Sequence, residues 1–104
     1  MEFAIRTVNL YKYLSKEKQE SIMSKQLLRS GTSVGANVRE ATEGQSKADF
    51  IAKMSIALKE TVETEYWLEL LYKTEYLTEK QYKDIAKVCS EMAKILTSIV
   101  KNSK

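Results

Sequence analysis

Four lysines recur every seven residues near the end of the chain, and their spacing is the clearest chemical signal in the sequence. They are Lys80, Lys87, Lys94 and Lys101, which we call the lysine row. Seven residues make nearly two helical turns, so on a helix these side chains would stand in line with steps of about 10 Å. Such a row could contact successive phosphates of RNA or DNA, although ordinary solvated helix faces carry the same pattern.

Positive charge is concentrated at both ends of the chain. Residues 79–104 carry six lysines against three acidic residues, and residues 1–16 also have an excess of basic residues, whereas residues 45–78 are acidic. We therefore expect the following side chains to contact any nucleic acid: Lys80, Lys83, Lys87, Lys94, Lys101, Arg6, Lys12 and Lys16. No arginine cluster reinforces them, and the tyrosines at 66, 72, 76 and 82 fall near apolar stripes.

The residues needed for common catalytic and metal sites are missing from the sequence. The chain has no histidine, which removes Ser-His triads and the Glu-x-x-His pairs of di-iron bundles. Its three glycines match neither a phosphate-binding loop nor a dinucleotide fingerprint, and Cys89 falls among apolar helix positions. We expect no enzymatic activity, no metal and no cofactor.

Composition predicts one all-α domain over residues 1–104. The 104-residue chain has no proline, few glycines and many strong helix formers. Helices are expected at residues 2–15, 19–43, 47–76 and 79–102. Capping-box patterns begin the last two, at Ser46 and Thr78, and Gly31 falls in the apolar stripe of the second, where a neighbouring helix could approach closely.

Glu65 falls near the centre of the main apolar stripe of the third helix, where an unpaired carboxylate would be costly. We expect a structural polar network around it, with Asn37 as one partner. The other candidate partners are Ser30, Ser33, Arg29 and Arg39.

A second apolar stripe on the third helix points almost directly away from the first. It consists of Ile56, Trp67 and Leu70. Because four helices cannot readily bury both sides of one member, we expect self-association through this stripe. The alternative is an irregular bundle in which Trp67 folds over a neighbouring helix.

No segment approaches the length of uninterrupted apolar residues that a membrane span needs, and the first residues lack the pattern of a signal peptide. A single cysteine suits a reducing compartment. These features predict a cytoplasmic protein that does not enter a membrane.

Residues 26–41 (QLLRSGTSVGANVREA), followed by 46–51 (SKADFI) and 56–68 (IALKETVETEYWL), resemble the bacterial family of the 23S rRNA intervening-sequence protein. The resemblance covers essentially the whole chain. It implies an antiparallel, up-down-up-down four-helix bundle that assembles as a homopentamer, without an established enzymatic activity. A relative, the accessory variability protein of diversity-generating retroelements, further implies a basic surface that binds nucleic acid and works with a reverse transcriptase.

Two functions follow as expectations. The first is a non-catalytic oligomer that binds RNA or DNA through the basic residues named above. The second is a structural or adaptor oligomer that recruits a protein partner and touches no nucleic acid.

Overall fold

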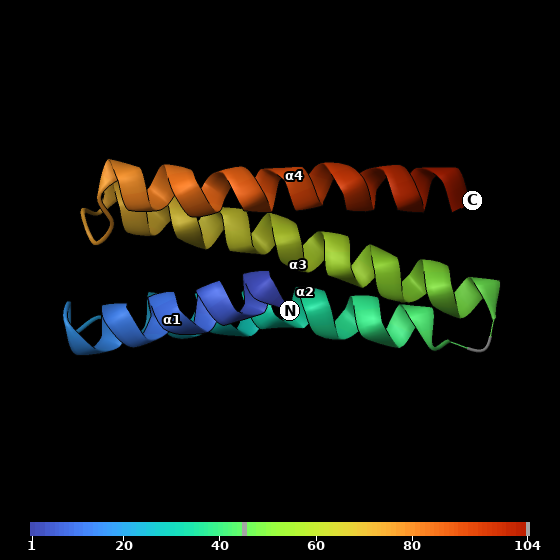
Figure 1. Ribbon diagram of the computed structural model, residues 1–104, viewed down its shortest axis with the longest axis horizontal. Coiled ribbons are helices and arrows are strands. Elements are labelled where there is room, and N and C mark those ends of the chain that lie inside the picture. Colours follow the sequence, from blue (N-terminus) through green and yellow to red (C-terminus); the bar gives the residue numbers. More distant parts are fainter. Residues whose placement is uncertain (45, 104) are drawn as a thin grey trace.

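In the part of the chain that the structure describes, four helices lie side by side in a rod of about 44 × 19 × 19 Å (Figure 1). In this computed structural model, residues 1–44 and 46–103 are described, and they contain no strand. The helices are α1 (Glu2–Lys16), α2 (Met23–Thr42), α3 (Lys47–Lys73) and α4 (Glu79–Ser103). The expected all-α class and four-helix order are therefore confirmed.

The two capping patterns begin their helices as expected. Ser46 precedes α3, and its hydroxyl accepts a hydrogen bond of 3.0 Å from the backbone N–H of Asp49. Before α4, the Thr78 N–H donates to Gln81 Oε1 at 2.9 Å while the Gln81 N–H donates to Thr78 Oγ1 at 3.1 Å. This reciprocal pair satisfies two backbone groups and fixes where α4 begins.

The second helix begins at Met23, later than the expected residue 19. The carboxylate of Glu20 turns back over the helix start and accepts hydrogen bonds from the N–H groups of Ile22, Met23 and Ser24, at 2.8 to 3.1 Å. Gln19, at φ 52, adopts the left-handed conformation. Glu20 is thus a buried cap that ends the turn, and the helix cannot extend through it.

The third helix ends at Lys73, earlier than the expected residue 76. Glu75, at φ 69, is left-handed, and its N–H donates to the Tyr72 carbonyl while the Tyr76 N–H donates to the Leu71 carbonyl at 2.9 Å. These two bonds form a Schellman motif, a common helix ending in which glycine usually occupies the position of Glu75.

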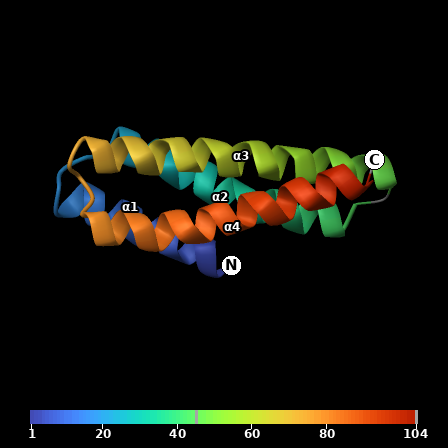
Figure 2. The same ribbon diagram turned by 90° about the horizontal axis from the view of Figure 1, so that it is seen from above.

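Successive helices run in opposite directions, so the chain goes up, down, up and down (Figures 1 and 2). The helix α2 packs against both α1 and α3, and α3 packs against α4. In both views α1 reaches only about half of the length of the molecule, with the N-terminus near its middle. The second halves of α2 and α4 therefore have no α1 beside them.

The core consists of two apolar clusters along the rod. One, at the end where α1 is present, includes Leu14, Leu27, Leu68 and Cys89. The other lies among α2, α3 and α4 and consists of Val34, Ala41, Met54, Ala57, Leu96 and Val100. Both follow the helical periodicity of the apolar residues, so burial of these stripes holds the four helices together.

Gly31 allows α1 and α2 to approach closely, as its place in the stripe predicts. A Cβ atom added at Gly31 would lie 2.5 Å from Cγ2 of the buried Thr7, whereas one added at Gly35 would meet nothing within 4 Å. Only the first of these glycines is needed for packing within the chain.

No helix in the described part of the chain is long and apolar enough to cross a membrane.

Candidate nucleic-acid interface

The lysine row stands on the outer face of α4, opposite the buried face. The buried positions are Ile85, Cys89, Leu96 and Val100, which repeat at intervals of four and seven residues. The four lysines of the row occupy the opposite side of the same helix, and all four are exposed. Burial of the apolar stripe therefore forces the row into solvent.

The four lysines of the row form no ion pair within residues 1–44 and 46–103. Asp84 and Glu91 lie three or four residues from Lys80, Lys87 and Lys94 on the same helix, so they offset part of the positive charge in the first half of the row. Lys83 differs, because its ammonium lies 2.6 Å from the carboxylate of Glu79. Their hydrogen bond, with the attraction between the charges, raises the pKa of Lys83 and lowers that of Glu79.

The second half of α4 adds neutral hydrogen-bonding groups to the row. A shallow depression of about 510 Å³ includes Lys94, Lys101, Ser90, Thr97, Ser98 and Asn102 among its lining residues. The Asn102 amide donates to Ser98 Oγ at 3.3 Å, which leaves the Ser98 hydroxyl hydrogen available to a ligand. No acidic residue follows Glu91 in the chain. Ammonium, hydroxyl and amide groups on one surface can all donate hydrogen bonds to phosphate oxygens.

The expected basic contacts of α1 lie on a different helix from the row. Arg6 is half-buried and lines a depression between α1 and α4 that also contains Gln81 and Asp84, so an acidic residue faces it. Lys12 and Lys16 are exposed on α1. The expected contacts thus fall into two groups, of which the one on α4 is continuous along a single helix.

The stripe expected to mediate self-association is partly used inside the chain. Trp67 is half-buried against the first apolar cluster, and its Nε1 donates to Glu63 at 3.1 Å. Leu70 is also half-buried, while Ile56 is 42% exposed. The packing of Trp67 matches the alternative in which the ring folds within its own bundle.

The expected pairing of Glu65 with Asn37 is absent from the described residues. The Asn37 amide donates instead to the Ser33 carbonyl of its own helix at 2.8 Å. Glu65 is half-buried on the flank of α3 that faces α4, where its charge contributes to the raised pKa values of Tyr82 and Cys89. One residue on a helix is a rotation of 100°, and this places Thr64, not Glu65, opposite α2.

The polar network between α2 and α3 uses other residues from the same stretch. Thr64 Oγ1 donates to Ser30 Oγ at 2.9 Å inside the core. Nearer the surface, Arg29 forms ion pairs with Glu60, at 3.1 Å, and with Glu63. In the described part of the chain no buried side-chain nitrogen or oxygen lacks a hydrogen-bond partner. These polar groups are structural, because each is satisfied within the bundle.

Groups that could support catalysis are few in the described residues. Their His, Cys, Asp and Glu side chains form no cluster that could hold a metal ion. Burial of Cys89, with a further contribution from the charge of Glu65, raises the pKa of its thiol to about 12. A thiol held in this way is a poor nucleophile, because the thiolate is the reactive form.

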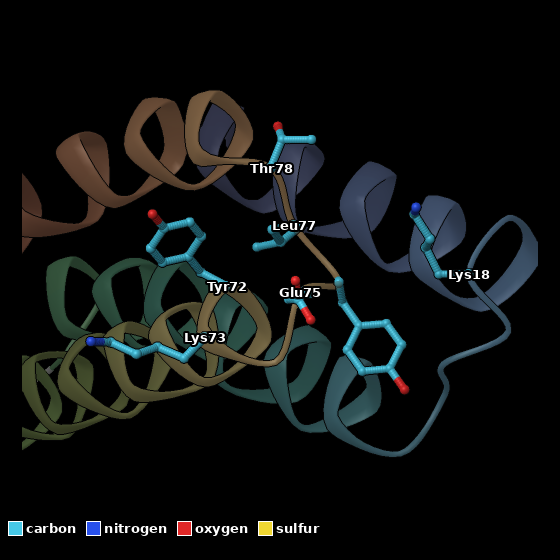
Figure 3. A pocket seen from close by; sticks show the side chains of 7 residues that line it. Lys18, Tyr72, Lys73, Glu75, Leu77 and Thr78 are labelled. Atoms are coloured by element: carbon cyan, nitrogen blue, oxygen red, sulfur yellow. The ribbon is translucent and has the colours of Figure 1, made fainter.

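The sequence patterns did not point to a second feature, a cavity at the end of the bundle where two turns meet. Its lining residues include Tyr72, Tyr76, Lys18 from the first turn and Lys73 at the end of α3 (Figure 3). The tyrosines were expected only near apolar stripes, and Lys18 is distant from them in the sequence. The two short turns, α1–α2 and α3–α4, could have indicated this site, because an antiparallel order of four helices places both turns at the same end of the bundle.

Comparisons with known proteins agree with this architecture. The family model of the 23S rRNA-intervening sequence protein matches residues 1–98. The chain is also similar to a crystal structure from Bacteroides thetaiotaomicron, of a protein with unknown function from the S23 ribosomal protein family. The two share 62% sequence identity with a TM-score of 0.94, over 96% of this chain and 93% of the other. No curated protein matches the chain.

Proposed function

Because this chain belongs to the family of the 23S rRNA-intervening sequence protein, we propose that it is a non-catalytic helical-bundle protein that binds RNA or DNA. The family assignment alone does not identify a function, since the similar crystal structure is of a protein with unknown function. The proposal therefore depends on the surface of this chain, and its binding surface is the lysine row of α4.

The observation that carries the proposal is the exposure of the whole row along one straight helix. Four ammonium groups with steps of about 10 Å extend over roughly 30 Å, at the rise of 1.5 Å per helical residue. Phosphate contacts of this kind depend little on base sequence and position the protein on the nucleic-acid backbone. We expect binding with weak sequence preference.

The test reverses charge on the row and measures affinity by fluorescence anisotropy of labelled RNA and DNA. The variant is Lys87→Glu, Lys94→Glu and Lys101→Glu together, all at exposed positions. These changes replace three attractive contacts by repulsive ones, so we expect binding to be lost at moderate salt.

A matched control makes the same change in net charge elsewhere. Lys25, Lys47 and Lys59 are exposed on α2 and α3, and their replacement by glutamate alters the net charge equally. If the control loses as much affinity as the row variant, general attraction and not the row is responsible. If wild-type protein binds neither RNA nor DNA, the proposal is wrong.

A structural or adaptor oligomer is the second candidate, and the exposed apolar side chains of the bundle favour it. Where α1 is absent, Ile95 on α4 is 60% exposed, and Ile5 and Ile56 are also exposed. The oligomer requires that such groups lie in one patch, because contiguous exposed apolar surface is typical of contacts between protein chains, whereas single exposed apolar side chains are common on any surface. The homopentamer implied by the resemblance would provide such contacts and would also multiply the lysine row.

Light scattering after gel filtration tests the oligomer. We expect wild-type protein to be larger than one chain and Ile95→Glu to shift the mass towards one chain. Lys94→Glu, which changes the preceding exposed position without touching an apolar group, is the control and should leave the mass unchanged. A wild-type mass of a single chain at all concentrations would contradict the oligomer.

A further inference from the structure

The second half of α4 differs from the first half in the charge of its surface. In the first half, Asp84 and Glu91 offset part of the positive charge of the row. No acidic residue follows Glu91, and none lines the shallow depression that contains Lys94 and Lys101. Seven residues separate these two lysines, so their Cα atoms stand about 10 Å apart along the helix. The surface between them carries only basic and neutral side chains.

Neutral polar side chains fill the space between the two lysines. At about 100° per residue, Ser90, Thr97 and Ser98 point within roughly 60° of the direction of Lys94. They therefore share its face of α4, and all of them line the same depression. A ligand that reaches both ammonium groups must also meet these hydroxyl groups.

The hydrogen bonds of this surface leave acceptors as well as donors for a ligand. Thr97 Oγ1 donates its hydrogen to the Ala93 carbonyl at 2.7 Å, so towards a ligand it can only accept. Ser98 Oγ accepts from the Asn102 amide at 3.3 Å and keeps its own hydrogen to donate. An ionised phosphate has no hydrogen to give, whereas the 2′-hydroxyl of RNA both donates and accepts. The acceptor between the lysines thus favours RNA over DNA.

The same half of the helix has no side chain on which an unpaired base could stack. No aromatic residue follows Tyr82 in the chain, and that ring is already stacked on Tyr72, with 4.5 Å between centroids. Proteins that bind single strands combine positive charge with aromatic side chains that stack on the bases. Because α4 is straight along its length (Figure 1), its row suits phosphates that a duplex holds in fixed positions.

The order of groups on α4 matches the minor groove of an RNA duplex. That groove is wide and shallow, displays 2′-hydroxyl groups, and has a phosphate backbone on either side. The depression has an ammonium group towards each end and hydroxyl groups between them. The minor groove of DNA is narrower and has no 2′-hydroxyl groups.

We propose that the second half of α4 binds across the minor groove of double-stranded RNA. Lys94 and Lys101 contact the two phosphate backbones, and Thr97 and Ser98 contact 2′-hydroxyl groups between them. The inference rests on the proposed function and adds to it the class of nucleic acid. Recognition of this kind depends on shape and backbone groups, so it agrees with a weak sequence preference.

Fluorescence anisotropy with four labelled ligands of one sequence tests the class of nucleic acid. The ligands are duplex RNA, duplex DNA, duplex 2′-O-methyl RNA and single-stranded RNA. The methylated duplex keeps the A-form shape but cannot donate from its 2′ oxygens. We expect wild-type protein to bind duplex RNA most tightly and each of the other three about fivefold or more weakly at the same salt concentration.

A double variant tests the hydroxyl contacts. Thr97→Val with Ser98→Ala removes both hydroxyl groups at exposed positions of α4. The loss of two hydrogen bonds should weaken binding of duplex RNA about tenfold and leave binding of duplex DNA unchanged. The control is Ser33→Ala with Thr42→Val on α2, where both hydroxyls donate to backbone carbonyls of their own helix and neither lines the depression. It should bind both duplexes as wild type.

The outcomes separate this inference from the proposed function. Equal affinity for duplex RNA and either duplex DNA or the methylated duplex would overturn the minor-groove contact and leave the lysine row in place. Tighter binding of the single strand, or no effect of the double variant on duplex RNA, would do the same. Absence of binding to all four ligands would overturn both the inference and the proposed function.

Discussion

Replacing the two helical glycines of α2 by alanine, one at a time, should have different effects on stability. Gly31 and Gly35 are one turn apart on the same helix, so both substitutions gain about 1 kcal/mol of helix propensity. Their surroundings differ, because Gly31 faces α1 and Gly35 faces open space.

The geometry around Gly31 sets the size of the effect. A new Cβ would lie 2.5 Å from Thr7 Cγ2 and 2.9 Å from Thr7 Oγ1. Thr7 cannot turn away easily, because it is fully buried, β-branched and donates its hydroxyl to the Phe3 carbonyl at 2.8 Å. The helix α1 must therefore shift, at a cost of about 1–3 kcal/mol for overpacking. Gly35→Ala carries no such cost.

Thermal unfolding followed by circular dichroism measures the difference. We expect Gly35→Ala to raise the melting temperature and Gly31→Ala to leave it unchanged or lower it, with about 10 °C between the two variants. Adding Thr7→Ser to Gly31→Ala removes the nearest methyl group and should recover part of the loss, as a coupling energy in a double-mutant cycle. Equal stabilisation by both alanines would refute the close approach of α1 and α2 at Gly31.

Three further changes test local features of the bundle. Thr78→Ala removes the side-chain half of the α4 capping box and should lower the free energy of unfolding by about 1 kcal/mol in chemical denaturation. Gln19→Gly relieves a left-handed residue and should raise the same free energy by about 0.5–1 kcal/mol; an unchanged value would show that the turn is unstrained. Cys89 should resist alkylation at pH 9 in folded protein and react after unfolding. Because burial raises its pKa from 9.0 to about 12, the thiolate fraction at that pH falls from about a half to about one in a thousand. Rapid alkylation of the folded protein would contradict its placement in the core.

Local patterns in the sequence predict much of the fold because they act over a few residues. Thr78 and Gln81 are three residues apart, and their reciprocal hydrogen bonds form as the capping pattern predicts. The heptad repeat of α4 likewise determines which side is buried and leaves the lysine row outside. The position of Gly31 in the stripe of α2 predicts a close helix contact, although it does not identify Thr7 as the partner.

Features that depend on the rotation of one helix against another were not predictable in this way. Glu65 and Thr64 are neighbours in sequence, yet Thr64 contacts Ser30 of α2 and Glu65 faces α4. An apolar stripe that is several residues wide does not specify which of these two residues contacts α2 and which faces α4. The cavity at the end of the bundle was not predictable for a similar reason, because it brings Lys18 together with residues more than fifty positions away in the sequence.

The salt dependence of nucleic-acid affinity is the most direct measurement of the role proposed for α4. Binding through four phosphates should give a slope of about −3 in a plot of log K against log salt concentration, for a single strand. The variant with glutamate at positions 87, 94 and 101 should show no measurable binding in the same range. Undiminished affinity and an unchanged slope in that variant would contradict the account, since the contacts would then lie elsewhere on the protein.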